Sequence, residues 1–358
     1  MGLPFFDSAV SRKRDQILAV DLGSRTTKAV CLQRRGQGFA LCGFALLDAP
    51  IYEKTLPPEL LTEHLKAVTQ ALQPKTRYVS LTAGVNDALL RHADIPRMPP
   101  HDMRRVLKLN AKSYLQQDLP GYVFDCHVGV RPQPPEPNGK LRDPGATPKQ
   151  RVLVAGARKQ FVDDFVLAAK GAGLVADCIS PGLIGLVNVF EKAMPELFEK
   201  EAVALVDVGF KNSSICIVQE GELILSRVVG IGGDRLTSGL AETLGISYAE
   251  AEGIKIGMPT EVQTQLESLL LPLGRELRAS MDFFEHQQDR PVTQVFLTGA
   301  SSGSAFVVQK LHQELMVECK LLTPTSFLEM QLPPQQTSEI EQVAPQLTVA
   351  LGAALAAL

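Results

Sequence analysis

The stretch Asp21-Leu-Gly-Ser-Arg-Thr-Thr-Lys28 joins two apolar runs, residues 17–23 and 26–33, through a short turn that contains Gly23. Two apolar runs with so short a connection predict a β-hairpin. Glycine at the tip lets the backbone come close to a ligand, so that its N–H groups can bind the oxygens of a nucleotide phosphate. A single copy of the motif is more often an ordinary β-turn, because Asp-x-Gly is common in turns.

The side chains around this turn suit a phosphate site with a metal ion. The hydroxyl groups of Ser24, Thr26 and Thr27 can donate hydrogen bonds to phosphate oxygens. Asp21, at the end of the first run, can hold Mg²⁺ through water, because this ion keeps several waters and takes few carboxylates. We therefore expect Asp21 to contact a metal ion indirectly.

A second stretch, Asp207-Val-Gly-Phe-Lys-Asn-Ser-Ser214, repeats the Asp-x-Gly and hydroxyl spacing after another apolar run, residues 202–208. The runs 213–219 and 222–229 follow, so the strand, hairpin and meander occur twice and the chain carries a weak internal duplication. Two such hairpins facing each other would clamp a polyphosphate from both sides. The repeat therefore favours the phosphate site over two unrelated turns, with Asp207 as the second metal residue.

A third motif, Val295-Phe-Leu-Thr-Gly-Ala-Ser-Ser302, is a predicted strand that passes through a turn of small residues into a predicted helix. Small residues at this turn, Gly299, Ala300 and Ser301, would give an aromatic base flat access to the backbone. The motif is weak alone and gains weight from its place after two phosphate hairpins.

Length and composition limit the class of protein. A chain of 358 residues predicts two domains or one bilobal domain. The formal charge of −3 argues against a dedicated nucleic-acid binder, which would be strongly basic. No apolar stretch reaches the about 18–20 residues of a membrane-spanning helix, and the bases at 12–14 follow the first apolar segment, unlike those of a signal peptide. We expect a cytoplasmic protein.

The pattern changes between residues 84 and 180. Strands are predicted near 89–95, 123–130 and 151–157, with helices near 102–117 and 160–171, which together predict a small α+β subdomain. Residues 131–150 contain six prolines and are expected to form a long solvated loop.

In this order, the three motifs resemble those of the actin-like ATPase superfamily over nearly the whole chain. The resemblance implies an α/β fold of the duplicated, ribonuclease H-like type: two lobes, each with a five-stranded sheet and helices, and ATP or ADP with Mg²⁺ between them. It implies that 21–28, with Lys28, is the first phosphate motif, that 207–214 is the second, and that 297–302 is the adenosine motif. The implied nucleotide contacts of the second lobe include Gly209, Ser213 and Ser214.

Two further stretches are similar to parts of this superfamily. Ile231-Gly-Gly-Asp-Arg-Leu-Thr237 is similar to the Gly-Gly turn after the second meander, which adds Gly232 and Gly233 to the implied site. Ala251-Glu-Gly-Ile-Lys255 is similar to a helix of bacterial actins, which implies that Glu252 and Lys255 approach the ribose and base. From the residues alone, a solvated helix face with Glu and Lys three apart remains open.

The position of the inserted subdomain resembles only the FtsA and PilM branch, and several stretches are similar to the PilM family of type IV pilus assembly proteins. These stretches are Ile95-Pro-Arg-Met98, Gln116-Gln-Asp-Leu-Pro120, residues 172–181, residues 266–284 and residues 344–352. A member of the FtsA family would be longer and end in a separate amphipathic helix, whereas this chain ends in an expected core helix, 345–358.

The PilM resemblance implies a nucleotide-binding scaffold at the cytoplasmic face of the inner membrane. It would bind the cytoplasmic N-terminal peptide of PilN in a groove between the first lobe and the inserted subdomain, lined by the strand 89–95 and the helix 102–117. It would link the pilus alignment complex to the motor ATPases, attach to the membrane through its partner, and possess at most slow ATPase activity. Self-association stays open, and no residue is identified that would orient an attacking water.

The resemblance also implies a division of the chain into parts. These are a flexible N-terminus (1–14), the first lobe (15–83), the inserted subdomain (84–180), a closing helix of the first lobe (181–200), the second lobe (201–232), a helical subdomain (233–289), the second lobe again (290–340) and a C-terminal helix of the first lobe (341–358). The N-terminal segment Leu3-Pro-Phe-Phe6 with the bases at 12–14 could contact a membrane weakly, although a frayed end is the simpler interpretation.

Two alternatives remain open. A small-molecule kinase of the same superfamily would need a catalytic acid after the first meander, for which Asp48 and Glu53 are available. A filament-forming, FtsA-like protein is the other. Phe210 and Lys211 stand in the second phosphate turn where the superfamily prefers small residues, Ser213 replaces a usual Thr, and Ala300 replaces a second glycine. These departures bear on tight ATP binding and turnover more than on the fold.

Overall fold

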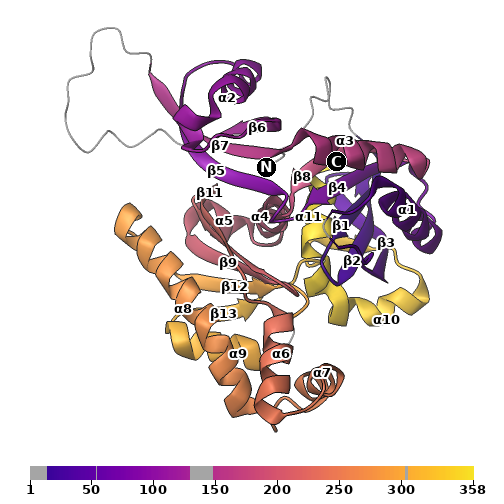
Figure 1. The fold of residues 1–358 in the computed structure, drawn as a ribbon, viewed down its shortest axis with the longest axis vertical. Coiled ribbons are helices and arrows are strands. Elements are labelled where there is room, and N and C mark those ends of the chain that lie inside the picture. Colours follow the sequence, from indigo (N-terminus) through magenta and orange to yellow (C-terminus); the bar gives the residue numbers. More distant parts are fainter. Residues whose placement is uncertain (1–13, 54, 130–147, 303–304) are drawn as a thin grey trace.

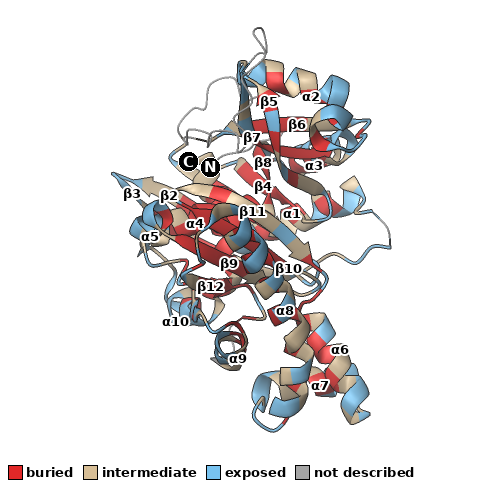
Figure 2. Ribbon diagram, turned by 90° about the vertical axis from the view of Figure 1, so that its left-hand side faces the viewer, coloured by how far each residue is buried: buried red, intermediate tan, exposed pale blue. Residues whose placement is uncertain are grey.

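The computed structural model describes residues 14–53, 55–129, 148–302 and 305–358. Two lobes lie side by side, with an additional subdomain on the first lobe (Figure 1). Each lobe is built on one β-sheet, and buried residues concentrate in these sheets and in the helices between them (Figure 2). The N-terminal segment 1–13 and most of the proline-rich loop, 130–147, lie outside the described residues.

The first sheet begins with the predicted antiparallel meander. Its strands are β1 (Gln16–Leu22), β2 (Thr26–Arg35) and β3 (Gly38–Asp48). On the other side of β1, parallel strands β4 (Tyr78–Ala83) and β8 (Val175–Pro181) extend the sheet, and β14 (Leu328–Met330) joins its β3 edge. The order is β14-β3-β2-β1-β4-β8.

The second sheet repeats this arrangement. Strands β9 (Ala202–Val208), β10 (Ser213–Gln219) and β11 (Glu222–Val229) form the antiparallel meander, and β12 (Gln294–Thr298) and β13 (Glu318–Leu321) run parallel beside β9. Its order, β11-β10-β9-β12-β13, corresponds strand by strand to β3-β2-β1-β4-β8 of the first sheet. The duplication that the sequence predicts is therefore present in the topology.

Two helices join the lobes at the centre of the molecule. Helix α4 (Gly182–Ala193) crosses α11 (Thr348–Ala357), and the backbones touch at Gly185 and Gly352, where an added Cβ on Gly352 would collide with the Gly185 carbonyl. Phe190 of α4 packs against Phe296 of β12, with 5.0 Å between ring centroids. One hydrophobic core therefore contains residues of both sheets.

The remaining helices cover the outer faces of the sheets. The first lobe carries α1 (Pro58–Leu72), whereas α5 (Pro195–Lys200) packs on β9 and β10 of the second sheet. The second lobe carries α6 (Gly233–Leu244), α7 (Tyr248–Gly257), α8 (Gln263–Gln288) and α9 (Ala305–Leu315). Helices α8 and α9 pack on the second sheet, and α6 and α7 form the far end of that lobe (Figure 1).

The inserted subdomain is a three-stranded antiparallel sheet with helices. Its strand order is β5-β7-β6, formed by β5 (Ala88–Pro96), β6 (Tyr122–Val128) and β7 (Lys149–Arg158). Helix α2 (Pro100–Leu115) covers this sheet, and α3 (Lys159–Gly171) packs on α1 and ties the subdomain to the first lobe. Residues 149–150, expected in the proline-rich loop, belong to β7.

The C-terminal part differs from the sequence expectation. Residues 290–340 are expected in the second lobe, but β14 pairs with β3, and helix α10 (Pro334–Val343) returns to the first lobe. There the Gln336 side chain forms hydrogen bonds with the backbone N–H and the carbonyl of Phe44. The expected boundary at 340 is therefore wrong for this segment. A strand of three residues and a helix that begins in Pro-Pro give almost no periodic signal.

The run 334–357, which joins α10, a 3₁₀ turn (Ala344–Leu347) and α11, is long and apolar enough to cross a membrane by length and composition alone. More than half of its most apolar window is buried inside the fold, at 56%. Because α11 contacts α4 and strands of the first sheet, we interpret the run as a core element.

Candidate functional site

The first hairpin positions Asp21 at the open end of the sheet. Asp21 pairs in register with Lys28, whose Nζ lies 3.3 Å from Asp21 Oδ2, and the hydroxyl of Thr82 on β4 donates to Asp21 Oδ1 at 2.9 Å. Neighbouring strands on both sides thus fix the carboxylate. At Gly23, a Cβ would lie 2.5 Å from both Lys28 Nζ and the Thr26 carbonyl oxygen, so the turn leaves no room for a side chain.

The second hairpin positions Asp207 in the same way. Asp207 on β9 is in register with Ser214 on β10 and with Thr298 on β12. Burial raises the pKa of Asp207 to about 6, while the Lys28 ammonium lowers it and the Asp21 carboxylate raises it. Two of these influences come from the first lobe, so the two predicted metal residues act on each other across the space between the lobes.

The third motif packs directly against the second phosphate turn. Gly299 has φ +97, a conformation that favours glycine, and a Cβ there would collide with the Asp207 carboxylate. The Ser301 N–H donates to the Val208 carbonyl at 3.0 Å, and its hydroxyl donates to the Gly209 carbonyl at 3.2 Å. The small residues therefore let this turn pack closely on the second phosphate turn, and they also leave its backbone accessible from the cavity.

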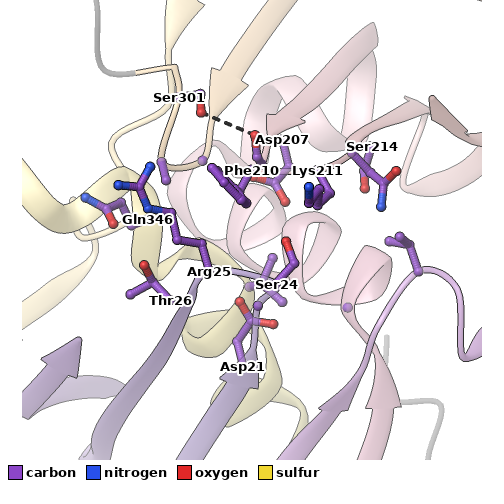
Figure 3. A pocket seen from close by; sticks show the side chains of 18 of the residues that line it. Asp21, Ser24, Arg25, Thr26, Asp207, Phe210, Lys211, Ser214, Ser301 and Gln346 are labelled. Carbon is purple, nitrogen blue, oxygen red and sulfur yellow. Dashed lines mark hydrogen bonds between the residues drawn. The ribbon is translucent and has the colours of Figure 1, made fainter. Parts of the chain in front are cut away.

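A cavity of about 900 Å³ lies between the lobes and collects most of the expected site. In Figure 3, Asp21, Ser24 and Thr26 approach it from the first lobe, and Asp207, Phe210 and Lys211 approach it from the second. Thirteen of the residues named from the sequence line this cavity: Asp21, Gly23, Ser24, Thr26, Lys28, Asp207, Gly209, Ser214, Glu252, Lys255, Gly299, Ala300 and Ser301.

Thr27 and Ser213 do not face the cavity. Both are fully buried; the Thr27 hydroxyl lies 2.7 Å from His64 Nε2, and Ser213 donates to the Ile231 carbonyl at 2.5 Å. Successive side chains of a strand point to opposite faces, so the neighbours Lys28 and Ser214 face the cavity instead. The expectation that these two hydroxyls contact a ligand is therefore wrong for this arrangement.

Gly232 and Gly233 lie behind the second phosphate turn, outside the lining of the cavity. The Gly233 N–H donates to the Gly209 carbonyl at 3.0 Å, and a Cβ on Gly232 would collide with the carbonyl of Phe210. The glycine pair therefore packs against the second phosphate turn on the side away from the cavity.

An ion pair connects the lobes at the mouth of the cavity. Arg25 Nη1 lies 2.8 Å from Glu252 Oε1, and the guanidinium sits 5.0 Å from the centre of the Phe210 ring. The other oxygen of Glu252 accepts hydrogen bonds from Thr237 and from Lys255 Nζ, the latter at 2.7 Å. Burial raises the pKa of Glu252, but the hydrogen bonds from Lys255, Thr237 and Arg25 outweigh it and lower the pKa.

Sequence reasoning missed this contact, which we call the interlobe clasp (Arg25, Phe210 and Glu252). Arg25 precedes Phe210 and Glu252 by more than 180 residues in the chain, so local patterns contain no signal for the contact between the lobes. Phe210 lines the cavity together with Arg25 and does not point into the core. Lys211 turns to the α6 side, where it donates to Asp234 at 2.7 Å and lowers the pKa of that carboxylate.

The second-lobe end of the cavity is apolar. Ile256, Pro259, Leu266, Leu270 and Phe306 line it, contributed by α7, α8, α9 and the α7–α8 connection. These residues could not be identified beforehand, because each also fits an ordinary amphipathic helix. Apolar walls beside a few polar groups are typical of small-molecule sites.

The carboxylates suit a Mg²⁺ ion held partly through water. No group of three or more His, Cys, Asp or Glu with metal-binding geometry occurs among the residues that the structure describes. Asp21 and Asp207 offer two carboxylates to one cavity, and Mg²⁺ usually takes one or two, with phosphates and waters as its other ligands. The donor set therefore fits this ion together with a polyphosphate.

Asp48 and Glu53, the acids that a small-molecule kinase would need, lie elsewhere. Both are exposed, and neither lines the cavity. Asp87, in the loop after β4, is a further carboxylate of the lining, and burial raises its pKa against the lowering influence of Arg158.

A second hollow, of about 390 Å³, adjoins the main cavity. Strand β5, the connection from α2 to β6, and β11 of the second lobe line it, through Leu89, Arg91, Gln117, Tyr122 and Arg227 among others. Residues 85–87 and Leu183 line both spaces. A movement of these shared residues would therefore alter both the main cavity and the hollow beside the inserted subdomain.

Comparison with known proteins agrees with this architecture. The family model described as type IV pilus assembly protein PilM matches residues 19–358. The solved PilM-PilN type IV pilus biogenesis complex is 22% identical, with a TM-score of 0.80 over 97% of this chain and 99% of that chain. The ethanolamine utilization protein EutJ from Carboxydothermus hydrogenoformans is 13% identical, with a TM-score of 0.53 over 97% of this chain and 91% of that one.

A further solved structure has the same fold. MreB 5 of Spiroplasma citri, solved bound to AMPPNP, is 9% identical, with a TM-score of 0.51 over 95% of each chain. The two duplicated sheets and these neighbours confirm the actin-like α/β fold.

Proposed function

The chain belongs to the family of the type IV pilus assembly protein PilM, and on this premise we propose that it is a nucleotide-binding scaffold of type IV pilus assembly. The observation that carries the nucleotide part is the meeting of two duplicated hairpins at one cavity, which Asp21 and Asp207 both line. The turns after the two carboxylates carry glycine, so no side chain obstructs the backbone there. The cation Lys28 lies next to Asp21. This combination suits a polyphosphate better than any other small anion.

The ligand would be ATP or ADP with Mg²⁺. Backbone N–H groups of the turns after Asp21 and Asp207 would hold the phosphates, and both carboxylates would hold Mg²⁺ through water. Glu252 and Lys255 would lie near the ribose, and the apolar end with Ile256 and Phe306 would receive the base. The solved AMPPNP complex of a protein with the same fold supports a nucleotide as the ligand.

The partner would be a PilN-like membrane protein, bound through its cytoplasmic N-terminal peptide; the solved PilM-PilN complex supports PilN as the partner. The hollow beside β5 suits the end of such a peptide, since it lies where the inserted subdomain meets the lobes. Through this partner the protein would sit at the cytoplasmic face of the inner membrane and link it to the motor ATPases.

Turnover of ATP would be slow at most. The carboxylates of the described cavity wall, besides Asp21 and Asp207, are Asp87 and Glu252, and Glu252 is engaged by Arg25 and Lys255. No observation favours the kinase alternative, because Asp48 and Glu53 lie outside the cavity. None favours an FtsA-like filament either.

Thermal unfolding with and without ATP and Mg²⁺ tests the nucleotide site. Ligand that binds only the native state raises the unfolding midpoint. We expect a clear rise for the wild type and none for Asp21→Ala or Asp207→Ala, each compared with its own ligand-free midpoint. Asp48→Ala, which removes an exposed carboxylate of the same first-lobe meander, should keep the wild-type rise. An unchanged rise in both cavity variants would disprove the site.

A further inference from the structure

Helix α2 of the inserted subdomain is kinked at Asn110, and on both sides of the kink it has one buried and one exposed side. Met103, Leu107, Ala111 and Leu115 are buried against the three-stranded sheet. The opposite face is solvent-exposed, and α2 lies at one extreme end of the molecule in both views (Figures 1 and 2). The buried residues explain why the helix packs where it does, but they do not explain what the outer face is for.

The outer face is basic. Arg105, Lys108 and Lys112 are exposed, and none of them forms an ion pair or a side-chain hydrogen bond with another residue in the part of the chain that the structure describes. Arg104, by contrast, is engaged by the buried Asp125 at 2.8 Å. The helix contains a single acidic residue, Asp102, although the whole chain has a formal charge of −3. Positive charge is therefore concentrated here against the trend of the molecule.

An apolar side chain stands among these cations. Leu109 is 78% exposed, between Lys108 and Lys112 in the sequence. One exposed leucine is ordinary on a protein surface. An exposed leucine near cations that have no ion-pair partner among the described residues, however, combines the two contributions that hold protein surfaces on anionic lipid, an apolar contact and charge attraction.

We propose that this basic face of α2 (Arg105, Lys108, Leu109 and Lys112) binds the anionic headgroups of a lipid bilayer. The three cations would attract the surface charge, and Leu109 would enter the boundary of the acyl region. The face would thereby set which side of the molecule is turned to the membrane.

A bilayer fits this face better than an acidic peptide does. Peptides are held in grooves or along sheet edges, and none of the four residues lines either of the two hollows described above. A convex helix at the end of the molecule needs only a flat partner, which a bilayer supplies. The contact would be weak by itself, since three cations and one apolar residue supply far less than a lipid anchor.

The inference deepens the proposed location at the inner membrane and rests on it for the presence of a bilayer. It involves neither the nucleotide cavity nor the partner peptide. The experiment therefore uses the full chain without nucleotide and without partner, so that a failure here leaves the proposed function standing and a failure of the nucleotide site leaves this result unaffected.

Sedimentation with vesicles tests the proposal. The wild type should bind vesicles that contain phosphatidylglycerol, should not bind vesicles of phosphatidylcholine alone, and should release as salt is raised, because added salt screens exposed charges. The triple variant Arg105→Glu/Lys108→Glu/Lys112→Glu should bind at least about 100-fold more weakly, since each cation near an anionic surface contributes about fivefold. Leu109→Ser should bind severalfold more weakly.

A control with the same change in charge keeps the test specific. Lys75→Glu/Lys200→Glu/Arg275→Glu alters three exposed bases outside α2 and should bind nearly as well as the wild type. Equal losses in both triple variants, or no preference of the wild type for anionic vesicles, would overturn the proposal. Binding of a labelled poly-glutamate peptide through α2, without vesicle binding, would also overturn it and assign the face to an acidic protein segment. Unchanged unfolding midpoints confirm that the variants are folded.

Discussion

Asp207 connects the chemistry of the cavity to the stability of the protein. Its carboxylate is held against Gly299 and beside Ser214, and burial raises its pKa to about 6. A charged Asp207 is therefore costly to the empty protein near neutral pH. A ligand that brings Mg²⁺ and binds the ionised form would offset this cost. Mg²⁺ would therefore gain more from binding near the buried Asp207 than from binding near a solvated carboxylate.

The pH dependence of stability checks this account of Asp207. Because its pKa is higher in the folded than in the unfolded state, the folded state binds more protons between about pH 4 and pH 6, and stability falls as pH rises through this window. Asp207→Asn should stabilise the empty protein by about 1–2 kcal/mol at pH 7.5, and the gain should shrink toward pH 4. Urea unfolding at both pH values measures it. Asp48→Asn should show no such gain. If the free energy of unfolding of Asp207→Asn at pH 7.5 equals that of the wild type or is lower, the assignment is contradicted.

Arg25 is the residue through which the first lobe holds the second at the cavity mouth. Its ion pair with Glu252 is partly exposed, and such pairs contribute about 0.2–1 kcal/mol, to which the contact with the Phe210 ring adds a similar amount. We expect the interlobe clasp to slow the release of bound nucleotide.

Stopped-flow release of a fluorescent ATP analogue measures this effect. Arg25→Ala should release it severalfold faster, up to about tenfold. Lys310→Ala, which removes a cation outside the cavity whose ion pair is with Glu267 of its own lobe, should change the rate little. In combination with Glu252→Gln, Arg25→Ala should add little further acceleration. Fully additive effects of the two substitutions would mean that the residues do not act together.

Among the elements, the crossing of α4 and α11 decides how the lobes are joined. Close contact at Gly185 and Gly352 lets the helix axes approach, and α11 reaches β1, β2 and β4 from there. The hairpins that end at Asp21 and Asp207 therefore depend on a junction built from residues that no ligand touches.

Substitution at Gly352 tests this junction. Gly352→Ala should destabilise the protein by about 1–3 kcal/mol, because its methyl group collides with the Gly185 carbonyl and the helices must move apart. Gly253→Ala on α7 is the matched control: nothing lies within 4 Å of its added Cβ, and a helical alanine should stabilise by about 0.5–1 kcal/mol. Chemical denaturation measures both variants, and equal stabilities would disprove the packing argument.

Elements with local signals could be predicted, and contacts between distant segments could not. The apolar runs on either side of Asp21 and Asp207 identify both meanders, since period and turn residues are local properties. The short strand β14 forms only because β3 offers an edge, and α10 lies in a segment that composition assigns to a loop. The side that Thr27 and Ser213 face follows from strand alternation, which the expectation for these two hydroxyls did not take into account.

On the scale of the whole molecule, two copies of one sheet topology enclose one cavity, and the inserted subdomain adds separate surfaces beside it. The wall shared by the cavity and the second hollow, residues 85–87 and Leu183, belongs to the first lobe, which also carries the inserted sheet. A nucleotide-dependent movement of one lobe would therefore change the shape of the second hollow. The four residues of the basic face of α2 line neither space, which suits a constant membrane contact.

The most direct test is a structure of the protein crystallised with AMPPNP and Mg²⁺. We expect the triphosphate between the turns that follow Asp21 and Asp207, touching both backbones, with the ion near both carboxylates through water and the base at Ile256 and Phe306. A nucleotide held by one hairpin alone, or bound outside the interlobe cavity, would contradict the account.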